Sequence, residues 1–268
     1  MQWTALNPVD TDVADPLFEA IQDDPLKRAL LKGFHGRILV DDAKAPNVAC
    51  GHVGWTYYVA GDVSHPHAKK LLESLPSGIE VLSDNPWKNE MQTFFGERAR
   101  LKTRYAMDHR TIEPCTLFPF IQKVKERYRI ELIDKKHYQT IIEESWGKDF
   151  VIHFKDFDDY RTNGLGFVAL DGEKIVGGVS SYARFPGGFD IEIITHESYR
   201  RQGIARGLGA LYIKTCLEKG LIPYWDAAHM QSRRLAESLG YTLDHAFEVI
   251  EIVKGNQGTD QFFQYHSL

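Results

Sequence analysis

The fold is decided by one stretch, GFDIEIITHESYRRQGIARGLGAL, which spans Gly188–Leu211. Its first part, rich in isoleucine, predicts a strand, and Ile204–Lys219 predicts a helix with apolar residues at helical spacing. The turn between them, Glu197–Gly203, contains Arg200 and Arg201 and ends in glycine. Glycine at a helix entrance lets a ligand approach the backbone, and the first N–H groups of a helix favour an anion. The residues alone therefore leave two alternatives open: an anion site, or a strand–turn–helix corner that binds nothing.

Two known nucleotide-binding patterns do not describe this turn, but a third does. The Lys-Ser or Lys-Thr pair of a Walker loop is absent, and so is the glycine spacing of a Rossmann fold. The run Arg200–Ala205 resembles the (Gln/Arg)-x-x-Gly-x-(Gly/Ala) loop with which the GNAT acetyltransferase superfamily binds the pyrophosphate of acyl-CoA. The stretch Pro223–Tyr241 resembles the second GNAT motif, a strand and then a helix that ends in Leu-Gly-Tyr. The resemblance covers roughly Tyr128–Leu268.

This resemblance implies an acetyl-CoA-dependent N-acetyltransferase that works by direct attack in a ternary complex, without a covalent enzyme intermediate. Within it, the Pro-x-Trp-Asp-Ala-Ala run that starts at Pro223 resembles a bacterial subfamily that includes zwittermicin-resistance-type acetyltransferases. The resemblance places the cofactor contacts at Ile194, Arg200, Arg201, Gln202, Gly203, Ile204, Ala205, His229 and Ser232. At His229 the second motif usually has asparagine, so the geometry of that contact is an open question.

The candidate general base lies on the strand that precedes the loop. Asp190 and Glu192 are two residues apart, so their side chains are expected on one face, opposite Ile191 and Ile193. We prefer Glu192 because it is nearer to the cofactor end; a solvated polar face without a catalytic role is the alternative. Many GNAT enzymes have a tyrosine on the following helix as the acid for the thiolate, and this chain has Ala236 there. Tyr241, Tyr224 or water remain as alternatives, as does a reaction that needs no acid.

The composition limits the class of protein. The chain has 268 residues, 43% hydrophobic and 26% charged, with a net charge of −5. This balance predicts a sizeable core and argues against a broad nucleic-acid or membrane-surface binder. The three cysteines, Cys50, Cys115 and Cys216, are odd in number and far apart, which fits a reducing cytoplasm. There is no apolar run long enough for a membrane span and no secretory signal, so neither is expected.

The chain is predicted to form two domains. We place the boundary near Glu126, which gives an N-terminal α/β domain at residues 1–126 and a GNAT domain with a mixed twisted sheet at residues 127–268. In the first domain, Val48–Ala60 is predicted as a single strand. The order helix–strand–strand–helix–strand–helix suggests that this domain is a degenerate copy of the second, without its loop; this is a hypothesis.

No metal is expected from the sequence. His52, His65 and His67 are close in the chain, but neither a carboxylate nor a cysteine stands beside them at ligand spacing. The expected partner is a small molecule with a primary amine, and a homodimer is left open. Two further functions are kept as alternatives: a non-catalytic GNAT-like module that senses acyl-CoA, and an acetyltransferase that acts on a protein or peptide.

Overall fold

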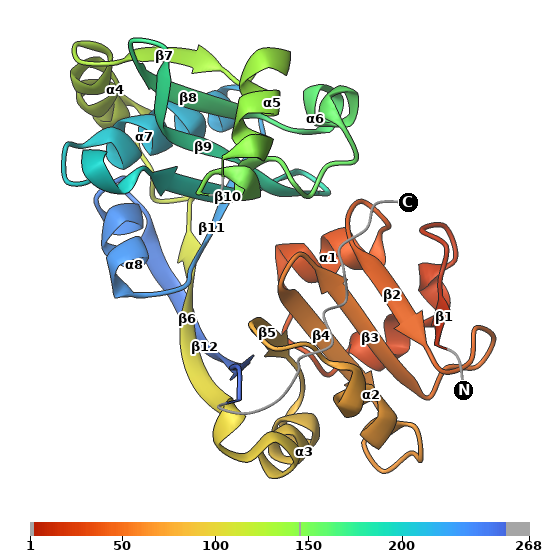
Figure 1. The fold of residues 1–268 in the computed structure, drawn as a ribbon. Coiled ribbons are helices and arrows are strands. Elements are labelled where there is room, and N and C mark those ends of the chain that lie inside the picture. The colour runs from red at the N-terminus through yellow and green to blue at the C-terminus, as the bar shows by residue number, and fades with distance from the viewer. Residues whose placement is uncertain (1–2, 145, 256–268) are drawn as a thin grey trace. The chain divides into compact units, whose positions relative to one another are not determined.

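The computed structural model describes residues 3–144 and 146–255 and divides into two compact units (Figure 1). One unit comprises the described residues up to Thr103 and from Phe247 onward, and the other comprises Arg104–Ala246. The predicted domain boundary near Glu126 falls inside the second unit and stays a prediction. The last residues of the predicted GNAT domain, 256–268, lie outside the described part of the chain.

The first unit is built around a mixed sheet with the strand order β1-β2-β3-β4-β5-β12. Strand β4 pairs with β5 in parallel, and the other neighbours are antiparallel. Its strands and helices are β1 (Thr4–Ala5), α1 (Pro25–Leu31), β2 (Arg37–Val40), β3 (Val48–Val53), β4 (Thr56–Gly61), α2 (Ala68–Ser74), β5 (Ile79–Leu82) and α3 (Asn85–Phe95), with short 3-10 turns at Thr11–Val13, Asp15–Phe18 and Gly96–Arg98. The last part of β12 (Thr242–Ile252) completes it.

The prediction of one strand over Val48–Ala60 is wrong. Gly54 adopts a φ of +58°, in the left-handed region that glycine tolerates, and the chain reverses there. The result is an antiparallel hairpin in which β3 and β4 pair from Val48 with Gly61 to Val53 with Thr56. Both strands are buried on both faces over most of their length, so their apolar residues form a nearly continuous run that conceals the turn.

The second unit contains a mixed sheet with the order β6-β11-β10-β9-β8-β7. Only β10 and β11 are parallel among its recorded neighbours, and helix α7 connects them. This confirms the predicted mixed sheet. The elements are the part of β6 (Ala99–Asp108) from Arg104 onward, α4 (Phe118–Lys125), β7 (Arg129–Leu132), α5 (Lys135–Glu143), α6 (Phe157–Asn163), β8 (Gly166–Asp171), β9 (Lys174–Phe185), β10 (Gly188–Thr195), α7 (Ile204–Glu218), β11 (Ile222–Ala227), α8 (Met230–Glu237) and the part of β12 up to Ala246, with 3-10 turns η4 (Pro114–Leu117), η5 (Lys148–Phe150) and η6 (Glu197–Tyr199).

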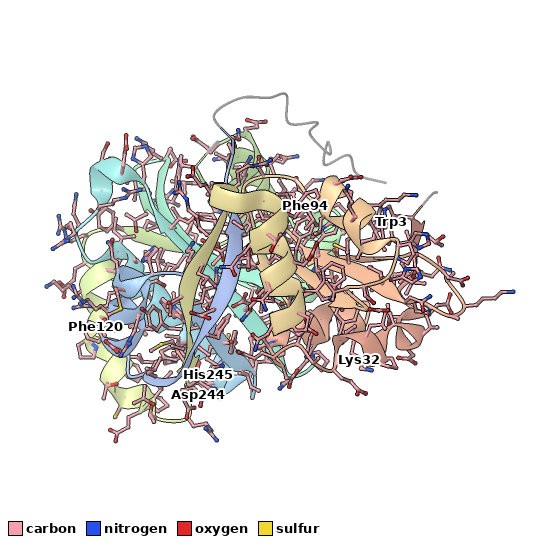
Figure 2. The ribbon with its side chains drawn as sticks, turned by 90° about the horizontal axis from the view of Figure 1, so that it is seen from below. Trp3, Lys32, Phe94, Phe120, Asp244 and His245 are labelled. Carbon is pink, nitrogen blue, oxygen red and sulfur yellow. The ribbon has the colours of Figure 1, made fainter. Side chains whose placement is uncertain are left out.

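Helices cover both faces of this second sheet because its strands alternate apolar residues between the two sides. Phe167 and Ala169 of β8 belong to the cluster that α4 and α7 bury, whereas Val168 and Leu170 belong to the cluster with α5, η5 and α6. On the first of these faces, the guanidinium of Arg206 from α7 lies 5.3 Å from the ring centre of Phe120 on α4, which Figure 2 labels. The strand β10 is therefore held between two layers of helices.

Candidate active site

The strands β10 and β11 separate partway along their length. They pair in parallel from Gly188 with Ile222 to Asp190 with Tyr224, and no further. Beyond that point β10 continues to pair with β9 as far as Thr195, while Trp225–Ala227 of β11 pairs with β6. The two strands therefore splay apart here, which opens the middle of the sheet beside the second half of β10.

The loop after β10 turns through two left-handed residues before α7 begins. Arg201 has a φ of +64°, the one positive value among the described residues other than glycine, and Gly203 has a φ of +82°. A Cβ at Gly203 would meet no atom within 4 Å, so this face of the loop is open. Gly203 is also the N-cap of α7 and has no side chain to satisfy the first helical N–H groups. Such a sequence of exposed N–H groups at a helix start forms a concave anion site.

The side chains of the predicted loop differ in what they contact. Arg200 and Arg201 are exposed, and Arg200 Nε donates to the carbonyl oxygen of Thr195 at 3.4 Å. The side-chain oxygen of Gln202 instead accepts from Tyr128 Oη at 2.6 Å and from Arg127 at 3.1 Å. Gln202 therefore braces the loop with its side chain and leaves its backbone for a ligand.

The two apolar residues at the end of the loop anchor and line it. Ile204 is 1% exposed and packs in the cluster below α7, and Ala205 is partly buried. On the preceding strand, Ile194 is partly buried against the cluster that contains Phe150. The structure thus brings Ile194 and the loop together at the carboxyl end of β10, next to the splay.

Glu192 occupies a partly buried position on β10, two residues before Ile194. Its neighbours Ile191 and Ile193 pack against the clusters that contain α7 residues, and Ile194 packs against η5, so the strand alternates as predicted. The pKa of the Glu192 carboxyl is raised to about 7, mainly by burial and in addition by the nearby Asp149 carboxylate, whereas the Ile193 N–H and Arg104 act in the opposite direction. A carboxyl group with this pKa can accept a proton near neutral pH.

Charged residues that the sequence analysis did not identify surround Glu192. Burial raises the pKa of Asp149, which lies in η5. Arg104 of β6 donates from Nε to Asp226 of β11 at 2.9 Å, and each side chain is 14% exposed. No local pattern marks these residues, because they reach the site from three different elements; Asp226 alone lies in a stretch that resembles a GNAT motif.

Two buried serines on β9 stand directly opposite this part of β10. Ser180 pairs with Glu192 and Ser181 with Ile191. Ser180 Oγ is 2.8 Å from the hydroxyl of Tyr160, and Ser181 Oγ is 2.9 Å from that of Tyr212. Directly paired residues share a face of the sheet, so Ser180 lies on the side of Glu192. The adjacent serines in an otherwise apolar strand were the available sequence signal.

The two predicted cofactor residues of the second motif have partners within the protein. His229 is the N-cap of α8, and its Nδ1 accepts from the N–H of Ser232 at 3.1 Å. The hydroxyl of Ser232 accepts from Trp225 Nε1 at 3.0 Å. His229 thus performs the capping role for which asparagine is also well suited, which accounts for the change of residue in the motif.

Most of the residues that could protonate the thiolate or act as a nucleophile have a structural role instead. Tyr241 donates to the carbonyl oxygen of Pro223 at 2.6 Å, and burial raises its pKa well above the usual value. Ala236 is fully buried in the core beside it. Burial also raises the pKa of Cys216 to about 12, so this thiol stays protonated and unreactive. Tyr224 is partly buried and remains a candidate acid.

Comparisons with known proteins agree on the family. The sequence model of the GNAT acetyltransferase family matches residues 15–250, which includes the first half of the chain, where the sequence motifs identified no resemblance. A crystal structure of a GCN5-related N-acetyltransferase-like protein from Streptococcus suis is similar at a TM-score of 0.81 and 31% identity, covering 92% of this chain and 99% of that one.

More distant matches agree in fold or over part of the chain. A GCN5-related N-acetyltransferase from Kribbella flavida has a TM-score of 0.50 at 12% identity and covers 76% of this chain and 86% of its own, which supports the fold alone. The uncharacterized N-acetyltransferase YdfB of Bacillus subtilis is 29% identical over 91 residues. That match spans 33% of this chain and 35% of YdfB, so it covers about a third of the curated relative.

Proposed function

The chain belongs to the GNAT acetyltransferase family, and from this premise we propose that it transfers an acetyl group from acetyl-CoA to the primary amine of a small molecule. Membership of this family makes it an acyltransferase. The observation that carries the proposal is the position of Glu192: a carboxyl with a pKa near 7 lies where β10 and β11 separate, on the strand that leads into the open Gly203 loop.

The donor is expected to bind with its pyrophosphate on the loop. The N–H groups at the start of α7 and the two exposed arginines, Arg200 and Arg201, supply positive charge for it. The pantetheine arm would then enter the splay between β10 and β11, which brings the thioester alongside Ile194. The proposed contacts are Ile194, the loop from Arg200 to Ala205, and the start of α8 at His229 and Ser232.

The chemistry needs a proton acceptor on the protein and no covalent enzyme intermediate. Glu192 takes one proton from the ammonium group of the acceptor, directly or through water, and the resulting neutral amine attacks the thioester carbonyl. The attacking nitrogen then loses its second proton to water. Backbone N–H groups near Ile194 would stabilise the oxyanion. When the tetrahedral intermediate collapses, the C–S bond breaks, the amide forms, and the thiolate leaves and takes up a proton. Tyr224 or water would supply that proton.

The chemical identity of the acceptor is the most specific part of the proposal. An antibiotic-like or other small amino compound is proposed from the subfamily resemblance of the Pro223–Ala228 run. The free thiols of Cys50, Cys115 and Cys216 are consistent with the proposed reducing cytoplasm. Among the described residues, no helix combines the length and apolar character that a membrane span requires.

Reversing the charge of Arg200 tests the donor site. Arg200→Glu should weaken acetyl-CoA binding about 10- to 100-fold, because it replaces a charge-assisted contact to phosphate by repulsion. Arg161→Glu is the matched control: it makes the same change of charge at an exposed position on α6. Isothermal titration calorimetry measures both, and equal affinities for the two variants would contradict the pyrophosphate role.

A panel of acceptors separates the proposed enzyme from its alternatives. Thiol release from acetyl-CoA should depend on a small primary amine and should not be replaced by peptides with free N-termini or lysines. Release only with peptides would favour protein acetylation. Tight acetyl-CoA binding without turnover of any acceptor would favour a sensor, for which the absence of the usual tyrosine at Ala236 is the motivating feature.

A further inference from the structure

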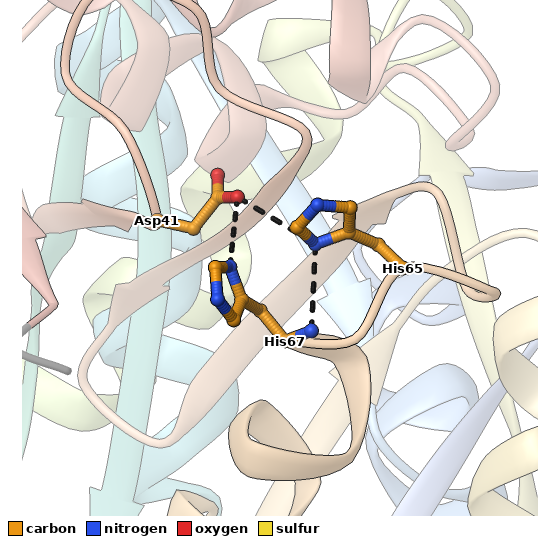
Figure 3. A group of neighbouring side chains, drawn as sticks. All are labelled: Asp41, His65 and His67. Atoms are coloured by element: carbon orange, nitrogen blue, oxygen red, sulfur yellow. Dashed lines mark hydrogen bonds and ion pairs between the residues drawn. The ribbon is translucent and has the colours of Figure 1, made fainter.

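The first unit contains a cluster of metal-ligating side chains that is separate from the acyl-transfer site. Asp41, directly after β2, lies beside His65 and His67, which precede α2 (Figure 3). One ligand atom from each residue lies within 4.8 Å of the others, and no second group of this kind occurs among the described residues. The carboxylate could not be associated with the histidines from the sequence, because Asp41 is 26 residues before His67 in the chain.

From this geometry we propose that Asp41, His65 and His67 bind a divalent transition-metal cation of the Zn²⁺ type. Two imidazole nitrogens and one carboxylate oxygen form a ligand set that Zn²⁺ accepts, with a fourth position left for water. The acyl-transfer reaction proposed above does not use this site, so the outcome of a test of one proposal does not affect the other.

The spacing of the ligand atoms supports a common metal. Asp41 Oδ2 lies 3.2 Å from His67 Nδ1 and 3.7 Å from His65 Nδ1. Around a tetrahedral zinc bound at about 2.1 Å, neighbouring ligand atoms lie roughly 3.4 Å apart. The two distances to Asp41 are close to this value, and a ligand atom of each residue lies within 4.8 Å of the others.

The carboxylate is prepared for this role by its own hydrogen bonds. Asp41 Oδ1 accepts from the N–H groups of Asn47 at 2.9 Å and Val48 at 3.1 Å, which leaves Oδ2 for the histidines. Its side chain is 2% exposed. Burial by itself would raise the pKa of Asp41, but these bonds and the one from His67 outweigh it and lower the pKa to about 2, so the group stays ionised. Ligating carboxylates in metal sites are commonly held in this way.

The histidines are held by a short, rigid turn. Asp62 Oδ1 accepts from the N–H of Ser64 at 2.9 Å and from its hydroxyl at 2.7 Å, and the carbonyl of Asp62 accepts from the N–H of His65 at 3.1 Å. Pro66 fixes the backbone between the two histidines. His65 Nδ1 accepts from the N–H of His67 at 3.4 Å, so this nitrogen carries a lone pair, and a bound cation would replace this long hydrogen bond.

The histidine side chains leave one side of the cluster open. They are 24% and 26% exposed, which gives an ion and a water ligand access from solvent. This corner between β4 and α2 has the same position in its unit as the Gly203 loop has between β10 and α7 in the other. A metal here would fasten the β4–α2 corner to the end of β2.

Titration of the full-length chain with ZnCl₂ tests the site, after removal of any affinity tag. Calorimetry should show one tight equivalent of Zn²⁺ and no comparable binding of Mg²⁺, which prefers oxygen ligands. His65→Asn and His67→Asn should each weaken Zn²⁺ binding by at least about 10-fold. Asp41→Asn should do the same, since its amide oxygen can still accept from Asn47 and Val48 while its NH₂ repels a cation.

A second histidine–carboxylate pair supplies the matched control. His245 lies 2.8 Å from Asp244 on β12 (Figure 2) but belongs to no three-ligand group, so His245→Asn should leave Zn²⁺ binding unchanged. Co²⁺ added to the wild-type protein should give the visible absorption of a tetrahedral site, which tests the geometry without any substitution. Absence of a tight Zn²⁺ equivalent, or equal binding by the folded cluster variants, would overturn the proposal.

Discussion

At the scale of single residues, the pKa of Glu192 depends on its environment in the folded chain and not on its position in a motif. Strand alternation predicts from the sequence alone that Glu192 lies beside Ile194. Its raised pKa depends on burial and on Asp149, which is 43 positions earlier in the chain (192 − 149) and comes from a separate 3-10 turn. Tertiary contacts of this kind leave no periodic signal, so Asp149 and Arg104 could not be assigned from sequence.

Replacing Glu192 tests its role as a base. Glu192→Gln should lower kcat about 10²- to 10⁴-fold, since it removes the proton acceptor and keeps the shape. The wild-type rate should rise with pH through about 7, as the carboxyl deprotonates, and this limb should vanish in the variant. Steady-state thiol release measures both. Glu197→Gln, an exposed change in η6, is the control; full turnover by Glu192→Gln would remove the assignment.

The Glu192 carboxyl should also affect how the free energy of unfolding depends on pH. The folded chain holds the Glu192 proton up to a pKa of about 7, whereas the unfolded chain releases it near the ordinary value of 4.5. The free energy of unfolding contributed by this group therefore falls as pH rises between these values. Relative to wild type, Glu192→Gln should gain about 1–3 kcal/mol between about pH 5 and pH 8. Urea unfolding at both pH values measures this, and parallel pH curves would contradict it.

At the scale of elements, the strand β10, the loop and α7 were predicted almost to the residue, because isoleucine alternation, glycine and helical spacing all agree there. The hairpin at Gly54 was missed, since apolar residues continue through both of its strands. Elements were thus predictable where several local sequence signals agreed.

Two glycine substitutions distinguish the role of the loop in acetyl-CoA binding from the cost of backbone strain in stability. Gly203 and Gly220 both have positive φ values, +82° and +69°, and a Cβ would meet no atom within 4 Å at either position. Gly203→Ala and Gly220→Ala should therefore each cost about 1–2 kcal/mol of stability. Only Gly203→Ala should also weaken acetyl-CoA binding, because only it alters the loop. Thermal unfolding and calorimetry compare them, and equal affinities would argue against the loop as donor site.

At the scale of the whole molecule, the two units share an order of strands. Each has an antiparallel meander, β2-β3-β4 or β8-β9-β10, then a parallel strand reached through a helix, β5 or β11, and then an antiparallel neighbour, β12 or β6. This likeness supports the proposal that the first half is a degenerate copy without the acyl-CoA loop. It was visible in the sequence only as an order of elements.

The C-terminal strand should be essential to the stability of the first unit. Ile250 of β12 is fully buried, belongs to the core of that unit and pairs with Val81 of β5. Ile250→Ala should cost about 2–4 kcal/mol, because it leaves a cavity in that core. Leu243→Ala, on the same strand but 38% exposed, should cost much less. Urea unfolding of both variants measures the difference, and equal losses would contradict this role of β12.

The central claim is acetyl transfer from acetyl-CoA to a small primary amine, and the most direct test is thiol release from acetyl-CoA across a panel of such amines, with the product identified by mass spectrometry. We predict amine-dependent release, with one acetylated amine formed for each thiol and a loss of this activity in Glu192→Gln. Thiol release that no small amine accelerates, from a folded protein that binds acetyl-CoA, would contradict the account.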